Sequence, residues 1–313
     1  MRYVIAMDSG GTKTDCVLCD TQGRVLRRVV EQGCNAFDLG YPVVEPRMHS
    51  LMEQITRDAP GPIGAVFAAV AGQGPKSSFP RDIIRQYVQP ETVIRTDNDG
   101  PCIITSMLGA ADGCGMIAGT GSSLFVRKNG EIVAKIGGRG YLIDTGGSAF
   151  EIGRDGIAAA YRALDGQGEP TVLVELLEEA MGVPVLKSRS RIYDQETGGR
   201  RYIASFARVV FRGWEMGDEV CRQIIDLGAE KQAMLVRAAA KHFDGEFTVV
   251  LSGGLHLHIP AYTELIRSKC PPQAKLLRAT VPPVCGGAME AMMDLGVTPD
   301  DTTRQNFMST YED

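Results

Sequence analysis

The sequence predicts an α/β protein built from two domains. Its 313 residues exceed the length of a typical single domain. Short apolar runs that suit strands alternate with segments that suit helices along most of the chain. Three of the predicted strands end in glycine-rich turns, which let a ligand approach the backbone closely. The same features therefore point to a ligand-binding α/β fold.

The predicted elements follow in chain order. Apolar runs in the first part predict strands at 3–8, 14–20, 24–31, 65–70 and 92–96, with helices around 48–55 (opened by Pro42), 80–88 and 101–109. The second part begins with strands at 114–118, 122–127 and 131–135 and closes with strand 247–251, helix 260–269, strand 274–278 and helix 283–294. Between them, apolar residues at helical spacing predict a helix within 215–243. Residues 166–170 and 187–201 are typical of loops. The basic residues of the second loop are expected on a solvated face, and contact with an anionic substrate is the alternative.

Composition narrows the class of protein. Hydrophobic residues make up 44% and charged residues 23% of the chain, as in soluble globular proteins. The formal net charge of −5 gives no support to nucleic-acid binding. No apolar run approaches the ~18 residues of a membrane span, and no signal peptide is visible at the start. We therefore expect a cytoplasmic protein without a membrane or nucleic-acid partner.

The eight cysteines are expected to be free thiols. Cys16 and Cys19 form a C-x-x-C pair, but they lie in a predicted strand, so their side chains would point to opposite faces. The other six are scattered singly, without a second pair at the spacing of a zinc site. A reducing compartment would keep such thiols unpaired.

The first glycine-rich turn suggests phosphate binding. Gly10 and Gly11 allow successive backbone N–H groups to form an anion-binding nest. Thr12 and Lys13 add a hydroxyl group and a cation. Asp8, at the carboxyl end of the preceding strand, suits a hydrated Mg²⁺. The alternative is an ordinary hairpin with two turn glycines.

Two further turns repeat the pattern after predicted strands. Each turn alone is a weak signal, whereas their order and spacing together are a strong one. The second turn contains Gly119, Thr120, Gly121 and Ser122, and the third contains Gly253 and Gly254.

These turns resemble the motifs of the sugar kinase, actin and heat-shock-protein-70 ATPase superfamily. Within it, the chain looks most like the family of N-acetylglucosamine kinases and BadF/BadG/BcrA/BcrD ATPases. The three turns match, in order, the first phosphate motif, the second phosphate motif and the adenosine motif. Residues 137–154 are similar to the family's GGWGxLLGDEGSxxxIGR stretch, and the resemblance runs from residue 3 to about residue 295.

The resemblance implies two ribonuclease-H-like (actin-like ATPase) domains with an ATP cleft between them. Residues 1–110 would form the N-terminal domain on the sugar-binding side. Residues 111–313 would form the nucleotide-binding domain, with a helical insert at about 146–243. In the superfamily, a helix matching residues 283–294 crosses the helix that joins the domains. Gly286 and Gly287 would permit that close crossing with residues 97–109, which is the expected hinge.

Asp97 and Asp99 are the candidate catalytic bases. They follow a predicted strand and precede a helix, and clefts form at the carboxyl ends of strands. A sugar kinase needs a carboxylate to accept the hydroxyl proton. The family base commonly follows an Asn, which fits Asp99 after Asn98 best and leaves Asp97 as the competitor. A capping role is the alternative for either residue.

The substrate residues follow from the resemblance alone. It implies that Asn35 bonds a sugar hydroxyl and that Gly72 belongs to a loop of the pocket wall. Arg139 stands where the family has Trp, and Thr145 begins the pair that replaces its Asp-Glu. Asp144 could supply the lost carboxylate one residue early. Arg139 could favour an acidic group, as on a muramic acid, or could lie on the surface.

The predicted function is ATP-dependent phosphorylation of a sugar, in particular an amino sugar or its N-acetyl derivative. The expected cofactors are ATP and Mg²⁺, and the expected assembly is a homodimer. Two alternatives remain: a BadF-type ATPase that activates a partner enzyme, and a non-catalytic actin-like ATP-binding protein. Some family ATPases hold an iron–sulfur cluster between subunits with paired cysteines. No confident match to those pairs is visible here, and Cys114 beside the second turn keeps this alternative open.

Overall fold

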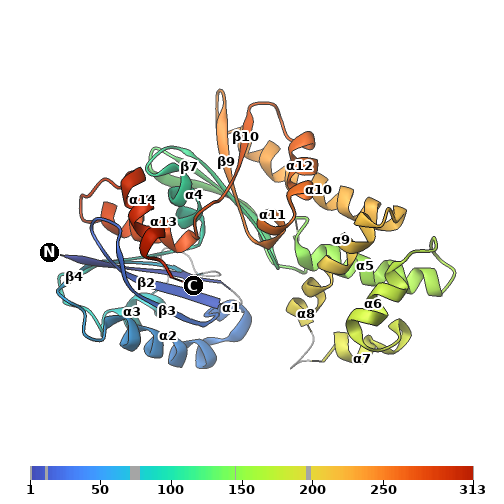
Figure 1. Cartoon of the computed structure of the whole chain (residues 1–313), viewed down its shortest axis with the longest axis horizontal. Coiled ribbons are helices and arrows are strands. Elements are labelled where there is room, and N and C mark those ends of the chain that lie inside the picture. Colours follow the sequence, from blue (N-terminus) through green and yellow to red (C-terminus); the bar gives the residue numbers. More distant parts are fainter. Residues whose placement is uncertain (1, 11–12, 71–77, 145, 195–198, 313) are drawn as a thin grey trace. The chain divides into compact units, whose positions relative to one another are not determined.

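The computed structural model describes residues 2–10, 13–70, 78–144, 146–194 and 199–312. Contacts divide the chain into two compact units (Figure 1). Unit 1 contains Met1–Gly115, Arg127–Ile132 and Ala279–Asp313, and unit 2 contains Met116–Val126 and Val133–Arg278. No helix among the described residues combines the length and the apolar character needed to cross a membrane.

Unit 1 is built on a five-stranded mixed sheet in the order β3-β2-β1-β4-β5. The antiparallel part arises from two consecutive hairpins, and the parallel part from crossovers through helices. Each strand predicted in this part of the sequence is confirmed, with bounds shifted by at most two residues. The strands are β1 (Tyr3–Ser9), β2 (Lys13–Asp20), β3 (Val25–Gln32), β4 (Ile63–Val70) and β5 (Val93–Asp97).

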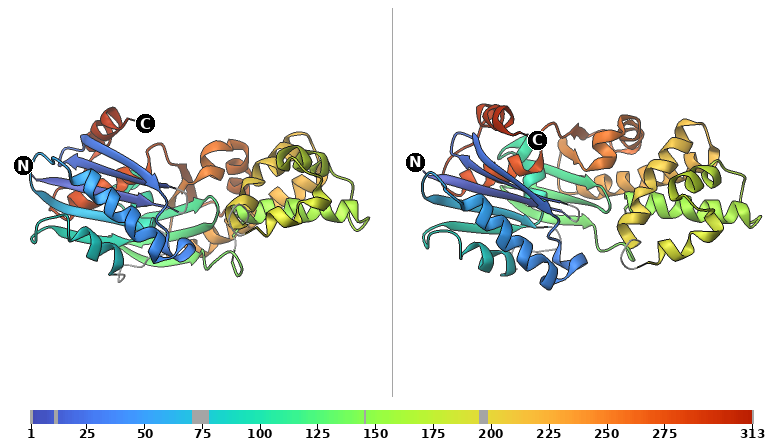
Figure 2. Two further views of the ribbon diagram at one scale, coloured as in Figure 1. Left: turned by 90° about the horizontal axis from the view of Figure 1, so that it is seen from below. Right: turned by 60° about the horizontal axis from the view of Figure 1, so that its bottom comes forward.

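Helices cover both faces of this sheet (Figure 2). On one face, α2 (Tyr41–Thr56) packs its apolar side against the strands, together with the short helices α1 (Ala36–Leu39) and α3 (Phe79–Ile84). On the other face lies α13 (Pro283–Met293). Cys16 belongs to the first apolar cluster and Cys19 to the second, which confirms that their side chains point apart. All eight cysteines are free, as expected.

Two helices of unit 1 cross in backbone contact. A Cβ atom added to Gly286 of α13 would lie 1.9 Å from the carbonyl oxygen of Cys102, in α4 (Gly100–Leu108). At the next position, a Cβ on Gly287 would meet the Cys102 sulfur at 3.1 Å. Only glycine permits this approach at position 286, because a methyl group would overlap a backbone atom. The predicted close crossing of these two helices is confirmed.

The end of the chain packs on unit 1, whereas the sequence placed residues 111–313 in one domain. The end of the chain packs there because the buried side of α13 lies against β1 and β4 rather than against the strand that precedes α13 in the chain. The following helix, α14 (Asp301–Thr310), was not predicted. It begins with a capping box in which Asp300 and Thr303 bond each other's backbone N–H groups.

The second sheet has the order β10-β9-β6-β7-β8, and it confirms the remaining predicted strands. The helical insert is confirmed as well, since α5 (Ala149–Leu164) to α10 (Glu219–Ala240) follow one another between β8 and β9. The loop predicted at 187–201 is wrong in part, because α7 (Arg189–Ile192) and the start of α8 (Gly199–Ser205) fall within it. The strands are β6 (Gly113–Ala118), β7 (Ser122–Lys128), β8 (Glu131–Gly137), β9 (Phe247–Ser252) and β10 (Ala274–Arg278), and the other helices are η1 (Val185–Lys187), α6 (Leu173–Met181), α9 (Ala207–Glu215), α11 (Gly254–His258) and α12 (Pro260–Lys269).

Candidate active site

The first phosphate turn joins β1 to β2 in unit 1. Gly11 and Thr12 lie outside the described residues. On either side of them, the amide of Gly10 donates to the Lys13 carbonyl at 3.0 Å. Ser9 and Thr14 share a buried hydrogen bond of 2.8 Å between their hydroxyl groups. The base of the turn is therefore fixed by hydrogen bonds on both sides.

Asp8 lies at the carboxyl end of β1, partly buried and directly opposite Asp15 in the β1–β2 register. Burial raises the pKa of Asp8 to about 7, and the charges of Asp99 and Asp15 add to this effect, while Lys13 opposes it. In the sheet register, Asp8 of β1 and Asp97 of β5 both align with Ala69 of β4. Asp8 and the end of β5, which leads directly to Asp99, therefore lie at the same edge of the sheet.

The two candidate bases occupy different surroundings. Oδ1 of Asp97 accepts hydrogen bonds from both the backbone and the side-chain nitrogen of Asn98, at 2.7 and 2.8 Å. Burial raises the pKa of Asp97, and these bonds partly offset the rise. Asp99 stands at the N-cap of α4, but its carboxylate makes no capping hydrogen bond. Asp97 is thus held by its neighbour in the chain, whereas Asp99 is the carboxylate that acts electrostatically on Asp8.

The carboxylates at this edge of the sheet suit Mg²⁺ better than a metal ion whose ligands all come from the protein. No group of three or more His, Cys, Asp or Glu suited to a metal occurs within the described parts of the chain. Mg²⁺ commonly keeps several waters and is bound by one or two carboxylates together with substrate phosphates. Asp8, whose charged form is disfavoured in the protein alone, would gain from such a cation.

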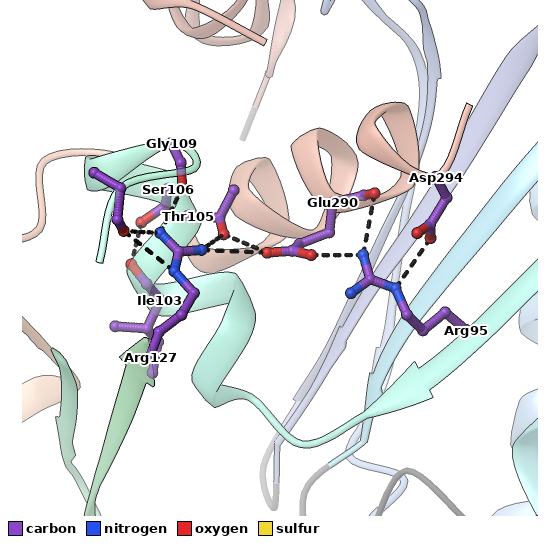
Figure 3. A network of polar contacts seen from close by, with 9 residues as sticks. Arg95, Ile103, Thr105, Ser106, Gly109, Arg127, Glu290 and Asp294 are labelled. Atoms are coloured by element: carbon purple, nitrogen blue, oxygen red, sulfur yellow. Dashed lines mark hydrogen bonds and ion pairs between the residues drawn. The ribbon is translucent and has the colours of Figure 1, made fainter. Parts of the chain in front are cut away.

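A polar network in unit 1 joins side chains of β5, α4 and α13 (Figure 3). Arg95, two residues before Asp97, donates to Glu290 at 2.5 Å and to Asp294 at 3.0 Å. Buried Glu290 also accepts from Thr105 and lies 3.6 Å from Arg127. The network ties β5, α4 and α13 together, and so fixes the strand and the helix that carry the candidate bases.

Sequence reasoning missed Glu290. A signal was present, because this residue stands among small apolar residues in a predicted helix, at a position that would be buried. A buried glutamate is almost always paired. Arg127 and Arg95, each within a predicted strand, were the basic residues available to it.

The sugar-site residues of unit 1 are only partly described. Asn35 is nearly buried directly after Cys34, whose amide donates to the Ser9 hydroxyl at 3.2 Å. That bond places Asn35 beside the strand that leads into the first phosphate turn. Gly72 lies outside the described residues. The role of Asn35 stays a prediction.

In unit 2, the second phosphate motif and the adenosine motif are adjacent. The Gly119 amide donates to the Gly121 carbonyl at 2.9 Å, which closes the turn that contains Thr120. A Cβ on Gly253, where φ is 91°, would lie 2.5 Å from the carbonyl oxygen of Ala118. Only glycine fits there. Gly254 begins α11, and Ser122 donates to the Gly146 carbonyl at 2.8 Å.

Arg200 was expected on a solvated face, but it lies against the second phosphate turn. A Cβ on Gly121 would be 2.6 Å from the Nη2 atom of Arg200, and the guanidinium lies 5.5 Å from the Tyr141 ring centroid. This arrangement places a permanent cation beside a turn predicted to hold phosphate. Arg200 stands in a predicted loop far from Gly121 along the chain, so its local sequence alone does not identify this turn as its neighbour.

The segment that departs from the family pattern lines a cavity of about 420 Å³ in unit 2. Asp144 and Tyr141 line it, whereas Arg139 is exposed and donates to the Lys135 carbonyl at 3.1 Å. Thr145 lies outside the described residues. The buried carboxylate of this region is Glu151, which sequence reasoning missed; it accepts from the Gly147 amide at 2.8 Å, and Lys231 and Arg154 pair with it.

Solved structures of similar fold include several sugar kinases. A putative N-acetylglucosamine kinase from Porphyromonas gingivalis has a TM-score of 0.73 at 18% identity, with 94% of this chain and 100% of that chain covered. The corresponding protein from Chromobacterium violaceum gives 0.70 at 19% identity, with 93% and 99% covered. A ROK family glucokinase from Streptomyces griseus, solved with glucose and AMPPNP, gives 0.62 at 15%, with 93% and 98% covered. These similarities establish the fold class as that of the two-domain, actin-like sugar kinases.

Sequence comparison gives the family. The model of the BadF/BadG/BcrA/BcrD ATPase family matches residues 5–291, so the chain belongs to this family. An N-acetylmuramic acid/N-acetylglucosamine kinase from Clostridium acetobutylicum is 26% identical over 253 residues, which cover 77% of this chain and 80% of the relative. An N-acetyl-D-glucosamine kinase from Dictyostelium discoideum is 24% identical over 310 residues, which cover 92% and 97%.

Proposed function

We propose that the chain is an ATP-dependent kinase of a sugar, and that the sugar is an N-acetylated amino sugar. The observation that carries this proposal is the sheet register, which places Asp8 and the end of β5, just before Asp99, at the edge where the first phosphate turn begins. One carboxylate suits a hydrated Mg²⁺, and the other suits a general base. Both similar kinases named above act, by their names, on N-acetylglucosamine.

Each residue has a role in this proposal. ATP would supply the transferable phosphoryl group, and Mg²⁺ would neutralise its developing charge. In unit 1, Lys13 would offer its ammonium group to a phosphate oxygen. In unit 2, taken by itself, the turn at Thr120 and Gly121 would offer backbone groups to phosphate, and Gly253 and Gly254 would leave room for adenosine against the backbone. Asp8 orders the magnesium ion through water. Asp99 accepts the proton of the sugar hydroxyl as the new bond to phosphorus forms.

The polar network of Glu290 contributes by positioning. Because Arg95 of β5 and Thr105 of α4 both bond Glu290, the strand and the helix that carry the candidate bases are linked through α13. A general base must stay within hydrogen-bond reach of the proton that it takes. The network therefore supports the geometry that the reaction needs without touching a substrate.

The cysteines argue against the alternative of an ATPase that holds an iron–sulfur cluster. Seven of the eight cysteines are buried, including Cys114, which lies near the start of β6. Burial raises the pKa of Cys114 to about 12. Metal and cluster ligands are thiolates, which an apolar environment disfavours. A cluster shared by two subunits would also need thiols at the surface.

The test is an ADP-release assay coupled to NADH oxidation, run with Mg-ATP and a panel of sugars. The panel contains N-acetylglucosamine, N-acetylmuramic acid, glucosamine and glucose. We expect release that depends on an N-acetylated amino sugar and that the Asp99→Asn variant lacks. ADP release that is equal with and without every sugar would reject the kinase and favour the ATPase.

A further inference from the structure

The C-terminal end of the chain packs on the hairpin of β2 and β3, the strands that follow the first phosphate turn (Figure 1). Asn306 of α14 donates to the Gln22 carbonyl at 2.8 Å, and the Val25 amide donates to Thr310 at the same distance. After the helix, the Glu312 carbonyl accepts from Arg28 at 2.6 Å. These contacts bring Tyr311 onto the same face of the sheet as Asp8.

Asp15, the register partner of Asp8, is the acceptor at the centre of this contact. Arg28 donates from Nε to Oδ1 at 3.0 Å and from Nη2 to Oδ2 at 2.7 Å. The hydroxyl of Tyr311 donates to Oδ2 at 2.7 Å, and its ring lies 4.1 Å from the Arg28 guanidinium carbon. Burial alone would raise the pKa of Asp15, but these bonds outweigh burial and lower it.

Lys13 also pairs with Asp15, but Asp15 holds it less tightly than it holds Arg28 and Tyr311. Lys13 and Asp15 are two residues apart on β2, so their side chains share one face of the sheet. The Lys13 ammonium lies 3.5 Å from Oδ2, against 2.7 Å for both Arg28 and Tyr311. The Lys13 side chain is 64% exposed, whereas that of Asp15 is 4% exposed. The Asp15 carboxylate thus receives its short hydrogen bonds from Arg28 and Tyr311, whereas the Lys13 ammonium group faces solvent.

We infer that Tyr311 and Arg28 are positioning residues of the phosphate site, because they saturate Asp15 and so leave Lys13 available to a nucleotide phosphate. The inference rests on the proposed function, in which Lys13 binds phosphate. Without the Tyr311 hydroxyl, Asp15 would keep its charge but lose one donor. Its attraction for Lys13 would then compete with the phosphate for the same ammonium group.

Calorimetric titration of Tyr311→Phe with Mg-ATP and, separately, with adenosine tests this inference. Phenylalanine keeps the ring against Arg28 and removes only the hydroxyl. We expect the Kd for Mg-ATP to rise about threefold to tenfold, which corresponds to the net contribution of an ordinary hydrogen bond because the effect reaches the phosphate only through Lys13. The Kd for adenosine, which has no phosphate, should not change. Asn306→Ala is the matched control, because it loosens the same helix without touching Asp15.

A second substitution makes the test directional. In the double variant Tyr311→Phe with Asp15→Asn, position 15 has no charge with which to hold Lys13, so Mg-ATP affinity should return toward the wild-type value. Equal Mg-ATP affinity of wild type and Tyr311→Phe would overturn the inference while leaving the kinase proposal intact. The inference would also be overturned if Tyr311→Phe and Asn306→Ala lost affinity for Mg-ATP and for adenosine to the same extent. That result would mean that Tyr311 has a structural role only. Absence of Mg-ATP binding by the wild-type protein would reject the proposed function itself.

Discussion

Gly286→Ala is the most discriminating test of the helix crossing in unit 1. The added methyl group would lie 1.9 Å from the Cys102 carbonyl oxygen and 2.7 Å from the Ser106 nitrogen. Both are backbone atoms of α4, so no side-chain rotation relieves the overlap. The adjacent Gly287→Ala is the matched control, since its methyl group would meet the Cys102 sulfur at 3.1 Å and the Ala6 methyl group at 3.3 Å.

The two substitutions differ in cost because their neighbours differ. Restoring an ordinary contact at position 286 requires α13 to move away from α4 by roughly 1.5 Å. Overpacking a well-packed core costs about 1–3 kcal/mol, and occasionally more. Alanine recovers about 1 kcal/mol of helix propensity at either position. We therefore expect Gly286→Ala to lose about 2 kcal/mol of unfolding free energy, and Gly287→Ala to change it by less than about 1 kcal/mol.

Urea unfolding followed by two signals measures the effect. Circular dichroism at 222 nm follows helices in both units, and fluorescence of Trp214, the one tryptophan of the chain, reports on unit 2. Two signals are needed because a chain with two units need not unfold in a single step. The substitution should lower the midpoint seen by circular dichroism. Equal midpoints for Gly286→Ala and wild type, or a larger loss in Gly287→Ala, would refute the packing argument.

Three further predictions concern the candidate bases, the buried network and a buried imidazole. Asp99→Asn should lower kcat about a hundredfold or more, the range of general-base catalysis, with Mg-ATP affinity nearly unchanged; a full rate in Asp99→Asn and its loss in Asp97→Asn would reassign the base. Glu290→Gln leaves two arginines without their shared carboxylate and should cost about 3–5 kcal/mol in urea unfolding; Asp294→Asn, at the more exposed end of the network, should cost less. Burial lowers the pKa of His256 to about 4, and neither ring nitrogen has a partner among the described residues, so the folded state binds fewer protons than the unfolded state and stability should fall as pH falls from 6.5 towards 4. His256→Leu should flatten this dependence in urea midpoints at pH 7 and pH 5; an unchanged slope would contradict it.

The strands were predictable because each is a short apolar run with a sharp end. β1, β4 and β9 are buried on both faces and read as continuous apolar sequence, and glycines or polar residues stop them. The short helix α7 shows no such signal, since it has only four residues, three of them polar, and none of them is buried. α14 buries only Thr303 and Phe307, so its apolar side is too narrow to show a helical period.

The candidate site was predictable where its residues follow strands, and not where tertiary contacts assemble it. Asp8 and Asp99 stand at strand ends, and the topology of a parallel pair brings such ends to one edge. Glu290, Arg200 and Tyr311 reach their positions through contacts with residues distant in sequence. Their local sequence resembles ordinary helix or loop, so only the packed structure reveals what they contact.

Asp8 and Asp15 show how the fold separates two identical residues. They lie directly opposite each other in the β1–β2 register, and burial acts to raise the pKa of both. For Asp15, bonds from Arg28 and Tyr311 reverse the effect, so the protein itself supplies the compensating donors. For Asp8, the neighbouring carboxylates add to the effect of burial and raise its pKa to about 7. A cation from outside the chain would therefore be stabilised most beside Asp8, and this asymmetry is the physical reason to place the magnesium ion there rather than at Asp15.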